Sequence, residues 1–403
     1  MNILILTSVY RDPSLSFRDR STNVVNSFVK EWVKQGHRVV VIHNSHSYPR
    51  IIHQIPDRIK KVLEAKMGFP ILNFDAVRRK TYIDNGANIF RIPVKKYIPH
   101  SKPSNYRLKK QTKRIINILS KINFKPDIVT GHWASPQMEI ISELKKIYMC
   151  QTAIVLHGSD YLKSRNYAVH KYLPNIDVIG TRSNSQSLKV QKILDLDELP
   201  FVCYSGIPDE YLNKYNLIID KFDKINKWKI TYVGRLVKYK NIDSVIMALS
   251  EINDSNWEFN IVGDGGERTA LEQLSKDLGC FDKVKFWNRV SRDTVMEILK
   301  DSHIFTMIST NEVFGLVYLE AMAASCLTIA SKDGGVDGII KNNSNGYLCK
   351  QGDSYELNQI FKKIMNSEVE EIQNIAKNAY FTANKYSDYD VAERYLKEIT
   401  SRK

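Results

Sequence analysis

Short apolar runs alternate with longer segments of helical periodicity in the first 200 residues. Residues 2–7 are apolar at most positions, as in a strand buried on both faces. Apolar residues at helical spacing follow over 21–35, where Gly36 can end the helix. Further strands are predicted at 38–43, 89–93, 128–130, 153–157, 178–180 and 201–204. This alternation predicts βα units that build a parallel sheet covered on both faces.

A second series of the same kind begins at residue 229, after a polar stretch rich in Asn and Lys. Its predicted strands are 229–233, 258–262, 283–286, 304–308 and 327–330, and its predicted helices are 242–252, 269–278, 292–300, 315–324, 355–367 and 391–400. The fold class is therefore α/β, with two doubly wound, Rossmann-like domains. Ligands of such sheets bind at the carboxyl ends of the strands. We expect an N-terminal domain over 1–205, a linker over 206–228, a C-terminal domain over 229–380 and a terminal helix within 381–403.

Composition narrows the class of protein. The chain has 403 residues, of which 43% are apolar and 26% charged, as in a globular protein of about two to three domains. It holds no apolar stretch long enough for a transmembrane helix, and residues 1–10 resemble a first strand more than a signal peptide. No two cysteines have metal-ligand or redox spacing, so we expect reduced thiols in a cytoplasmic protein. They are Cys150, Cys203, Cys280, Cys326 and Cys349.

Positive charge is concentrated in the first half. The net charge of the chain is +15, and residues 50–125 hold 19 basic and 4 acidic residues. Such a segment attracts polyanions or an anionic membrane surface. No zinc finger, RNA-recognition signature or basic-region heptad is present, so nucleic acid is not expected as a partner. Residues 56–66 and 106–122 read as basic helices with an apolar side, which suits a membrane surface or, alternatively, a solvated face over an ordinary core.

Two glycine turns follow predicted strands of the second series. Gly234 comes directly after the first of them, and Arg235 and Lys240 flank the start of the next helix. Both cations can converge on an anion that the helix N-terminus also binds. Gly263 follows the next strand and permits close approach of a nucleoside or phosphate. Solvent-exposed cations and an ordinary turn are the alternative interpretation.

Two carboxylates with seven residues between them mark the loop and helix after residue 308. Glu312 precedes the helix and can accept hydrogen bonds from sugar hydroxyls. The N–H groups of Phe314, Gly315 and Leu316 can point at a phosphate at the helix start. Glu320 lies further along among apolar residues, where a carboxylate needs a partner, and we expect it to bind a ribose diol. Alternatively, Glu312 complements the helix dipole and Glu320 lies on the surface.

Polar residues also end two strands of the first series. His157 follows the strand 153–157, where it can contact a donor sugar, and Asp160 can cap a helix or bind a hydroxyl. His132 and Trp133 occupy a similar position after 128–130. A histidine at a strand end can equally be structural.

These loops, in this order and spacing, resemble those of the retaining GT-B glycosyltransferases of family 4. The resemblance rests on Gly234-Arg235-Leu236 with Lys240, Gly263-Asp264-Gly265, Glu312-Val313-Phe314-Gly315 and Glu320-Ala321-Met322-Ala323, supported by Gly334-Gly335, His157-Gly158-Ser159-Asp160 and Gly36-His37-Arg38-Val39. It implies the GT-B fold, in which two domains face a central cleft and the C-terminal helix crosses back to the N-terminal domain.

The resemblance also implies roles for individual residues. Arg235 and Lys240 would bind the donor diphosphate, and Glu320 the ribose. Glu312, with the N–H groups of residues 314–316, would hold the sugar and its phosphate. His157 would face the sugar from the other domain, so that Glu312 and His157 are the expected catalytic residues. No metal or protein nucleophile is expected, because cations and the helix dipole neutralise the leaving diphosphate, whose oxygen takes the acceptor proton.

Two loops depart from the family pattern. The loop 8–20 after the first strand lacks the Gly-Gly pair of many members, and Arg18 is a candidate to supply charge there. Val336-Asp337 stands where the family often has Pro and Glu.

The sequence thus predicts a retaining hexosyltransferase that uses a nucleotide diphosphate sugar, with UDP favoured, and needs no further cofactor. Its acceptor would be a glycan or lipid-linked glycan of a bacterial surface polysaccharide such as a capsule. We expect a cytoplasmic protein that associates peripherally with the inner membrane face through residues 50–125. The alternatives are a nucleotide-sugar epimerase of similar two-domain shape and a non-catalytic polyanion-binding protein.

Overall fold

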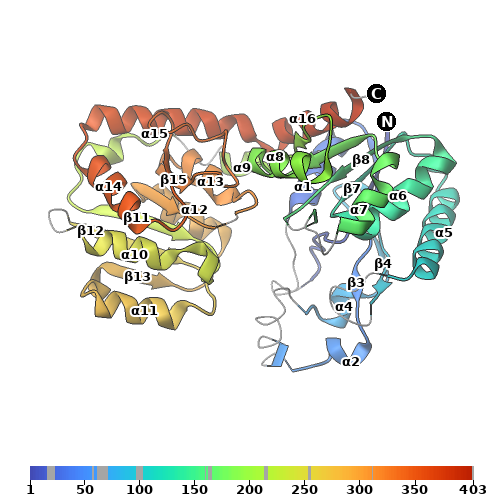
Figure 1. Ribbon diagram of the computed structural model, residues 1–403, viewed down its shortest axis with the longest axis horizontal. Helices are drawn as coiled ribbons and strands as arrows, with labels where there is room; N and C mark the ends of the chain where they lie inside the picture. The colour runs from blue at the N-terminus through green and yellow to red at the C-terminus, as the bar shows by residue number, and fades with distance from the viewer. Residues whose placement is uncertain are drawn as a thin grey trace. The chain divides into compact units, whose positions relative to one another are not determined.

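The protein divides into two compact units in the computed structural model (Figure 1). The first comprises Met1–Arg182, Gln186–Cys203 and Val391–Lys403, and the second Ser183–Ser185 and Tyr204–Asp390. The terminal helix from Val391 onwards thus belongs to the first unit. The structure describes residues 1–15, 23–56, 59–60, 71–96, 103–158, 160–161, 166–212, 217–252, 256–310 and 312–401.

An eight-stranded sheet forms the centre of the first unit, in the order β10-β9-β8-β7-β1-β2-β5-β4. Its strands are β1 (Asn2–Thr7), β2 (Arg38–His43), β4 (Lys80–Asp84), β5 (Ala87–Arg91), β7 (Ile128–His132), β8 (Gln151–Val155), β9 (Val178–Thr181) and β10 (Phe201–Val202). All neighbours pair in parallel except β4, which is antiparallel to β5. The parallel strands are apolar because both faces are covered.

Strand β4 was not predicted from the sequence. It is an edge strand whose side chains are partly or fully exposed, so it lacks a continuous apolar run. The turn that joins it to β5 holds Asn85 and Gly86, both at positive φ (47° and 81°). An Asn-Gly turn of this kind is the usual signal for a hairpin, and it identifies the strand in retrospect.

The helices of the first unit are α1 (Val24–Lys34), α2 (Arg50–His53), α4 (Phe74–Val77), α5 (Asn105–Lys121), α6 (Ala134–Tyr148), α7 (Asn166–Tyr172), α8 (Asn184–Leu194) and α16 (Asp388–Ser401). A small separate sheet pairs β3 (His46–Ser47) with β6 (Val94–Lys95). On one face, Leu4 and Leu6 pack in a core with α5 and α6. Elsewhere in the unit α1 packs against α16, where Trp32 Nε1 donates to Ala392 O at 2.9 Å.

Six parallel strands form the sheet of the second unit, in the order β13-β12-β11-β14-β15-β16. They are β11 (Trp228–Val233), β12 (Trp257–Val262), β13 (Val284–Trp287), β14 (Ile304–Met307), β15 (Leu327–Ser331) and β16 (Tyr347–Cys349). The α/β class with parallel sheets is therefore confirmed. Strand β16 was not predicted, because three residues are too few to carry a pattern.

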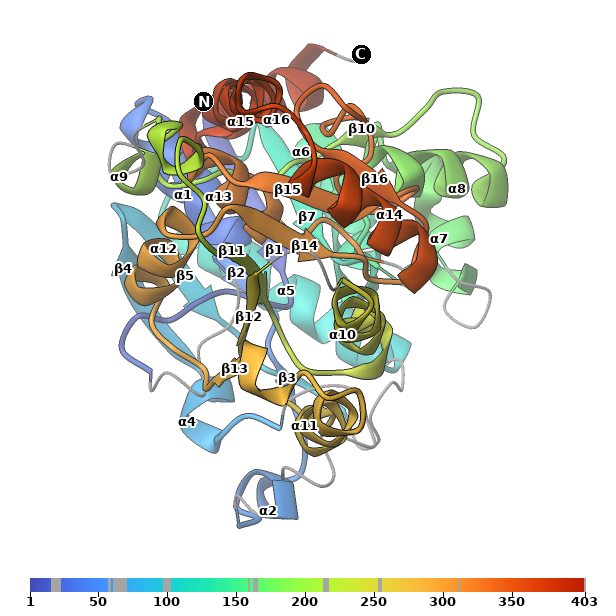
Figure 2. The same cartoon turned by 90° about the vertical axis from the view of Figure 1, so that its left-hand side faces the viewer.

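The second sheet lies between two groups of helices (Figure 2). The helices of the unit are α9 (Asp209–Leu212), α10 (Ile242–Ser250), α11 (Arg268–Asp277), α12 (Arg292–Lys300), α13 (Leu316–Ala323), α14 (Ser354–Met365) and α15 (Val369–Ala383). Helices α10 and α14 lie on one side of the strands, and α12 and α13 on the other. Helix α15 was missed by the sequence analysis, although its buried Ile372, Ile375 and Ala379 follow helical spacing.

All five cysteines are free and buried. Within the described ranges, none of the helices combines the length and apolar character needed to span a membrane.

Candidate functional site

Two glycines allow the loops after β11 and β12 to approach each other closely. Gly263 has a φ of 146°, and a Cβ there would lie 1.9 Å from the carbonyl oxygen of Gly234. A Cβ on Gly265 would lie 2.2 Å from the carbonyl oxygen of Leu236. No side chain fits at either position, so the close approach that Gly263 permits is made here by the neighbouring loop.

The two predicted cations of the first loop have different surroundings. Arg235 is exposed, and its Nη2 donates to Tyr239 Oη at 2.8 Å. Lys240 ends a short 3₁₀ turn (Lys238–Lys240), and its Nζ forms an ion pair with Glu312 Oε2. The side chains of that pair are only 12% and 14% exposed. The structure thus brings together the predicted phosphate and sugar residues Lys240 and Glu312, while Arg235 remains open to solvent.

Hydrogen bonds join the loop after β11 to the loop after β14, which leads to Glu312. Asn241 Nδ2 donates to Ile308 O at 2.8 Å and to Thr310 Oγ1 at 3.0 Å. The N–H group of Thr310 donates to Tyr239 O at 2.8 Å. The sequence analysis missed Asn241 and Thr310. The unusual φ of 52° at Asn241, next to a helix start, is visible only in the structure.

The turn before α13 is shaped by glycines. Gly315 has a φ of 79°, and a Cβ on Gly335 would lie 2.4 Å from Phe314. In the part of the chain that the structure describes, the N–H groups of Gly315 and Leu316 donate to no other group. Such donors at the start of a helix form an anion site.

Glu320 has a cationic partner that the sequence analysis did not identify. Arg292, the first residue of α12, forms an ion pair with Glu320 through Nη2 and Oε1. The Arg292 guanidinium also lies 4.7 Å from the ring centroid of Tyr211. The glutamate side chain is 12% exposed and the arginine side chain 32%. The expectation that this carboxylate needs a partner is met by Arg292.

In the first unit, the histidine that ends β7 and the histidine that follows β8 are in contact. His132 Nδ1 lies 3.1 Å from His157 Nε2, and the His157 ring stacks on Trp133 at a centroid distance of 4.1 Å. Trp133 has a φ of 66°, a conformation that bulky residues rarely adopt. Burial, and then the charge of Arg182, lower the pKa of His157 well below its usual value, so its imidazole is neutral near pH 7.

Asp160 fastens the loops after β7 and β8 to each other. Its Oδ2 accepts hydrogen bonds from His157 N at 2.8 Å and from Ala134 N at 3.1 Å. Ala134 lies just before the regular part of α6, which begins after the extended Ser135 (φ −108°, ψ 134°).

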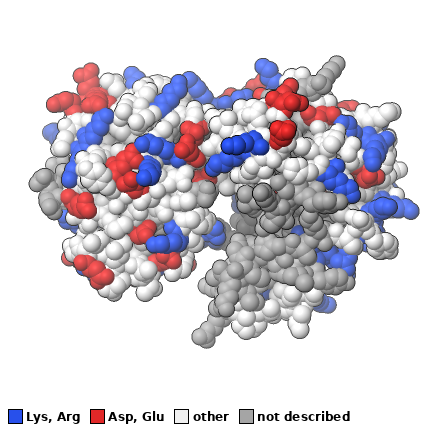
Figure 3. Space-filling view, viewed as in Figure 1, with Lys and Arg blue, Asp and Glu red and all other residues white. Residues whose placement is uncertain are grey.

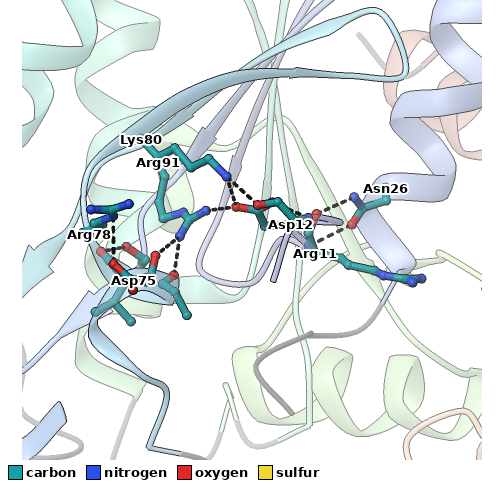
Figure 4. A network of polar contacts seen from close by, with 11 residues as sticks. Arg11, Asp12, Asn26, Asp75, Arg78, Lys80 and Arg91 are labelled. Carbon is teal, nitrogen blue, oxygen red and sulfur yellow. Dashed lines mark hydrogen bonds and ion pairs between the residues drawn. The ribbon is translucent and has the colours of Figure 1, made fainter. Parts of the chain in front are cut away.

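The loop after β1 is held by a polar network (Figure 4). Asp12 Oδ2 accepts from Lys80 Nζ at 2.8 Å and from Arg91 Nη2. Arg91 Nη1 in turn donates to the carbonyl oxygens of Asp75 and Ala76 at 2.9 and 2.7 Å. Although burial acts to raise it, the hydrogen bonds from Lys80 and Ser14 hold the pKa of Asp12 at about 2. This network holds Asp12 in place at the start of the loop after β1.

Some predicted features lie outside the described residues. They are Arg18, Ser159, Asn311 and most of the basic segment 56–66. Across the residues that the structure does describe, no three His, Cys, Asp or Glu side chains gather as metal ligands.

Comparison with known proteins finds similarity to glycosyltransferases. Residues 217–381 match the model of the glycosyl transferases group 1. The N-acetyl-alpha-D-glucosaminyl L-malate synthase of Bacillus anthracis is 28% identical over 57% of this chain, a match that spans 62% of that relative and so less than two thirds of it. The putative teichuronic acid biosynthesis glycosyltransferase TuaC of Bacillus subtilis is 24% identical over 90% of this chain and 91% of its own. The alpha-monoglucosyldiacylglycerol synthase of Acholeplasma laidlawii is 24% identical over 82% of this chain and 88% of its own.

Solved structures show the same fold. A glycosyltransferase from Rickettsia africae superimposes with a TM-score of 0.69 at 18% identity, over 100% of this chain and 99% of its own. Anabaena HepE in complex with UDP superimposes with a TM-score of 0.65 at 17% identity, over 100% of both chains. By their names, TuaC is a glycosyltransferase of teichuronic acid biosynthesis and the Acholeplasma relative synthesises a glucosyldiacylglycerol. Residues 217–381 thus match the glycosyl transferases group 1, and the chain shares the GT-B fold of these solved glycosyltransferases, as the sequence resemblance predicted.

Proposed function

We propose that the protein is a retaining hexosyltransferase that takes its sugar from a UDP-sugar and transfers it to a glycan or lipid-linked glycan. The observation that carries the proposal is the ion pair of Lys240 with Glu312 beside the exposed Arg235. Cations, a carboxylate and free N–H groups at one set of loops suit a sugar joined to a diphosphate. The UDP complex of the structural relative HepE supports the choice of nucleotide.

Each of these groups would have a distinct task. Arg235, with a planar guanidinium open to solvent, would bind the diphosphate. Lys240 would share its Nζ between Glu312 and a phosphate oxygen, and the N–H groups of Gly315 and Leu316 would face the same phosphate. Glu320, oriented by Arg292, would accept hydrogen bonds from the ribose hydroxyls. Gly234 and Gly263 would keep the loops in place.

The chemistry that follows is stabilisation of a leaving group. When the bond between the sugar and the phosphate breaks, negative charge grows on the diphosphate, where fixed cations and N–H groups lower the barrier. The departing oxygen takes the proton of the acceptor hydroxyl, so no protein base is needed. Glu312 would hold the sugar hydroxyls. Roles for His157 and Asp160 at the donor remain predictions from the family resemblance.

Replacing Arg235 with alanine is expected to weaken UDP binding at least about tenfold, which corresponds to about 1.4 kcal/mol. The reason is that the variant loses the exposed cation of the proposed diphosphate site. Isothermal titration calorimetry with UDP measures the effect. Lys238→Ala is the matched control, since it removes a positive charge from the same loop, where Lys238 pairs with Asp243. Equal affinities of the Arg235→Ala variant and the unaltered protein would contradict the assignment.

The acceptor would be held at an anionic membrane surface on the cytoplasmic side, through the basic face of α5. The apolar residues of this helix, among them Ile115 and Leu119, are buried in the core, so its membrane contact would be electrostatic. Lys109, Lys110 and Lys113 are exposed. In Figure 3 basic side chains predominate around α5, whereas both signs are interspersed over the second unit.

Reversing two charges, in Lys109→Glu with Lys110→Glu, is expected to lower binding to phosphatidylserine vesicles at least about tenfold, because each basic residue near such a surface contributes about 1 kcal/mol. Vesicle sedimentation at low ionic strength measures it. Lys362→Glu with Lys363→Glu on α14 is the control, since these lysines are also adjacent and exposed on a helix. Equal losses in the two variants would show that net charge, and not α5, sets the binding.

A further inference from the structure

A hydrogen-bonded row of four side chains leads from the C-terminal helix to His157. Thr130 Oγ1 lies 2.6 Å from Tyr395 Oη, and Tyr395 Oη lies 3.3 Å from His132 Nε2. The other ring nitrogen of His132, Nδ1, lies 3.1 Å from His157 Nε2. Thr130, His132 and Tyr395 are at most 2% exposed, so water does not compete for these bonds. All four residues belong to the first unit.

The direction of the protons in this row follows from the partners that each group has. Within the described residues, the Thr130 hydroxyl contacts Tyr395 alone, so its proton is satisfied only if Thr130 donates to Tyr395. Tyr395 then donates its own proton to Nε2 of His132. His132 consequently carries its proton on Nδ1, which donates to Nε2 of His157.

Two neutral imidazoles in contact need one donor and one acceptor. Burial, and then the charge of Arg182, lower the pKa of His132 to about 3, and His157 is affected in the same direction. Both rings are therefore neutral near pH 7, and each has one protonated nitrogen. Since His157 Nε2 accepts from His132, the proton of His157 must be on Nδ1.

We propose that Tyr395 is a positioning residue which, through His132, fixes His157 in the tautomer that carries its proton on Nδ1. That nitrogen contacts no group in the described part of the chain. His157 then offers a neutral N–H donor, whose ligand is an oxygen acceptor such as a sugar hydroxyl, and it does not act as a base. The consequence for transfer rests on the proposed function, whereas the tautomer itself does not.

The packing of the helix supports a fixed position for the Tyr395 hydroxyl. Its ring packs edge-on against Phe28 at a centroid distance of 5.0 Å and stacks with Phe201 at 5.6 Å. Aromatic neighbours in these geometries restrain the ring. Trp32 holds the same turn of α16 through its hydrogen bond to Ala392.

Nitrogen-15 NMR of histidine-labelled protein tests the proposal, because two-bond correlation spectra report which ring nitrogen carries the proton. We expect both His132 and His157 in the Nδ1–H form at pH 7.5. In Tyr395→Phe the donor to His132 Nε2 is lost, and both rings are expected to shift toward the Nε2–H form. Tyr389→Phe, an exposed tyrosine of the same helix, is expected to leave both spectra unchanged.

The outcomes separate this inference from the proposed function. A spectrum of the unaltered protein with the His157 proton on Nε2 overturns the inference, even where Tyr395→Phe fails to fold. Unchanged tautomers in a folded Tyr395→Phe variant overturn it as well. UDP binding is measured in the same samples. Intact binding with the tautomer shift and a fall in kcat at constant KM supports both proposals, while absent UDP binding to the unaltered protein refutes the proposed function alone.

Discussion

Replacing Glu312 with alanine is expected to lower kcat at least about 100-fold while UDP affinity stays the same or increases. Turnover falls because the sugar loses the carboxylate proposed to hold its hydroxyls. Nucleotide affinity does not fall, because Lys240 is released from its ion pair and the diphosphate can take the place of the carboxylate. Initial-rate kinetics with a UDP-sugar and calorimetry with UDP measure the two effects separately.

Control variants and an unfolding measurement make the Glu312 result interpretable. Glu297→Ala removes an exposed carboxylate from α12 in the same unit and is expected to leave turnover unchanged. Urea unfolding shows whether the fold survives, since truncating one member of a largely buried pair destabilises proteins by up to about 3–5 kcal/mol. Lys240→Met with Glu312→Ala removes both charges and should recover part of any lost stability. Full activity of Glu312→Ala would eliminate this residue from catalysis.

Acidification from pH 7 to pH 5 is expected to destabilise the protein by several kcal/mol, well before its carboxylates are protonated. Burial, and then nearby cations, lower the pKa of His43 and His132 to about 3 and that of His303 to about 4. The unfolded chain takes up these protons near pH 6.5, and the folded chain does not. Because the unfolded state then binds more protons, the free energy of unfolding decreases as the pH falls below about 6.5.

Each such histidine contributes about 2 kcal/mol of this loss at pH 5, since one pH unit is worth about 1.4 kcal/mol per proton. Urea unfolding at several pH values between 7 and 5 gives the slope of the free energy of unfolding against pH. Replacing His43 with glutamine removes one of the protons that the unfolded chain takes up and the folded chain does not. The free energy of unfolding should then fall less steeply with pH. Asp12 contributes in the same direction only at lower pH, because its folded pKa is about 2. A free energy of unfolding that is constant from pH 7 to pH 5 would disprove the account.

Much of the fold follows from local patterns. The central strands of both sheets are mostly apolar, because each is covered on both faces, and they were placed correctly to within a few residues. Strand β4 escaped prediction because an edge strand needs no apolar run. Helix α6 was missed, and its first turn is irregular: Trp133 has a positive φ and Ser135 is extended (φ −108°, ψ 134°), so regular helical geometry begins only after Ser135.

The sequence by itself determined the two α/β units, the glycine turns after β11 and β12, and which side chains are the candidates for chemistry. These depend on short-range periodicity and on motifs contained in one loop. Only the tertiary structure decided the partners of those side chains. Lys240 meets Glu312 from 72 positions away, Arg292 meets Glu320 from 28, and Tyr395 reaches His132 from 263. Such contacts are set by strand order and helix packing, which no local pattern encodes.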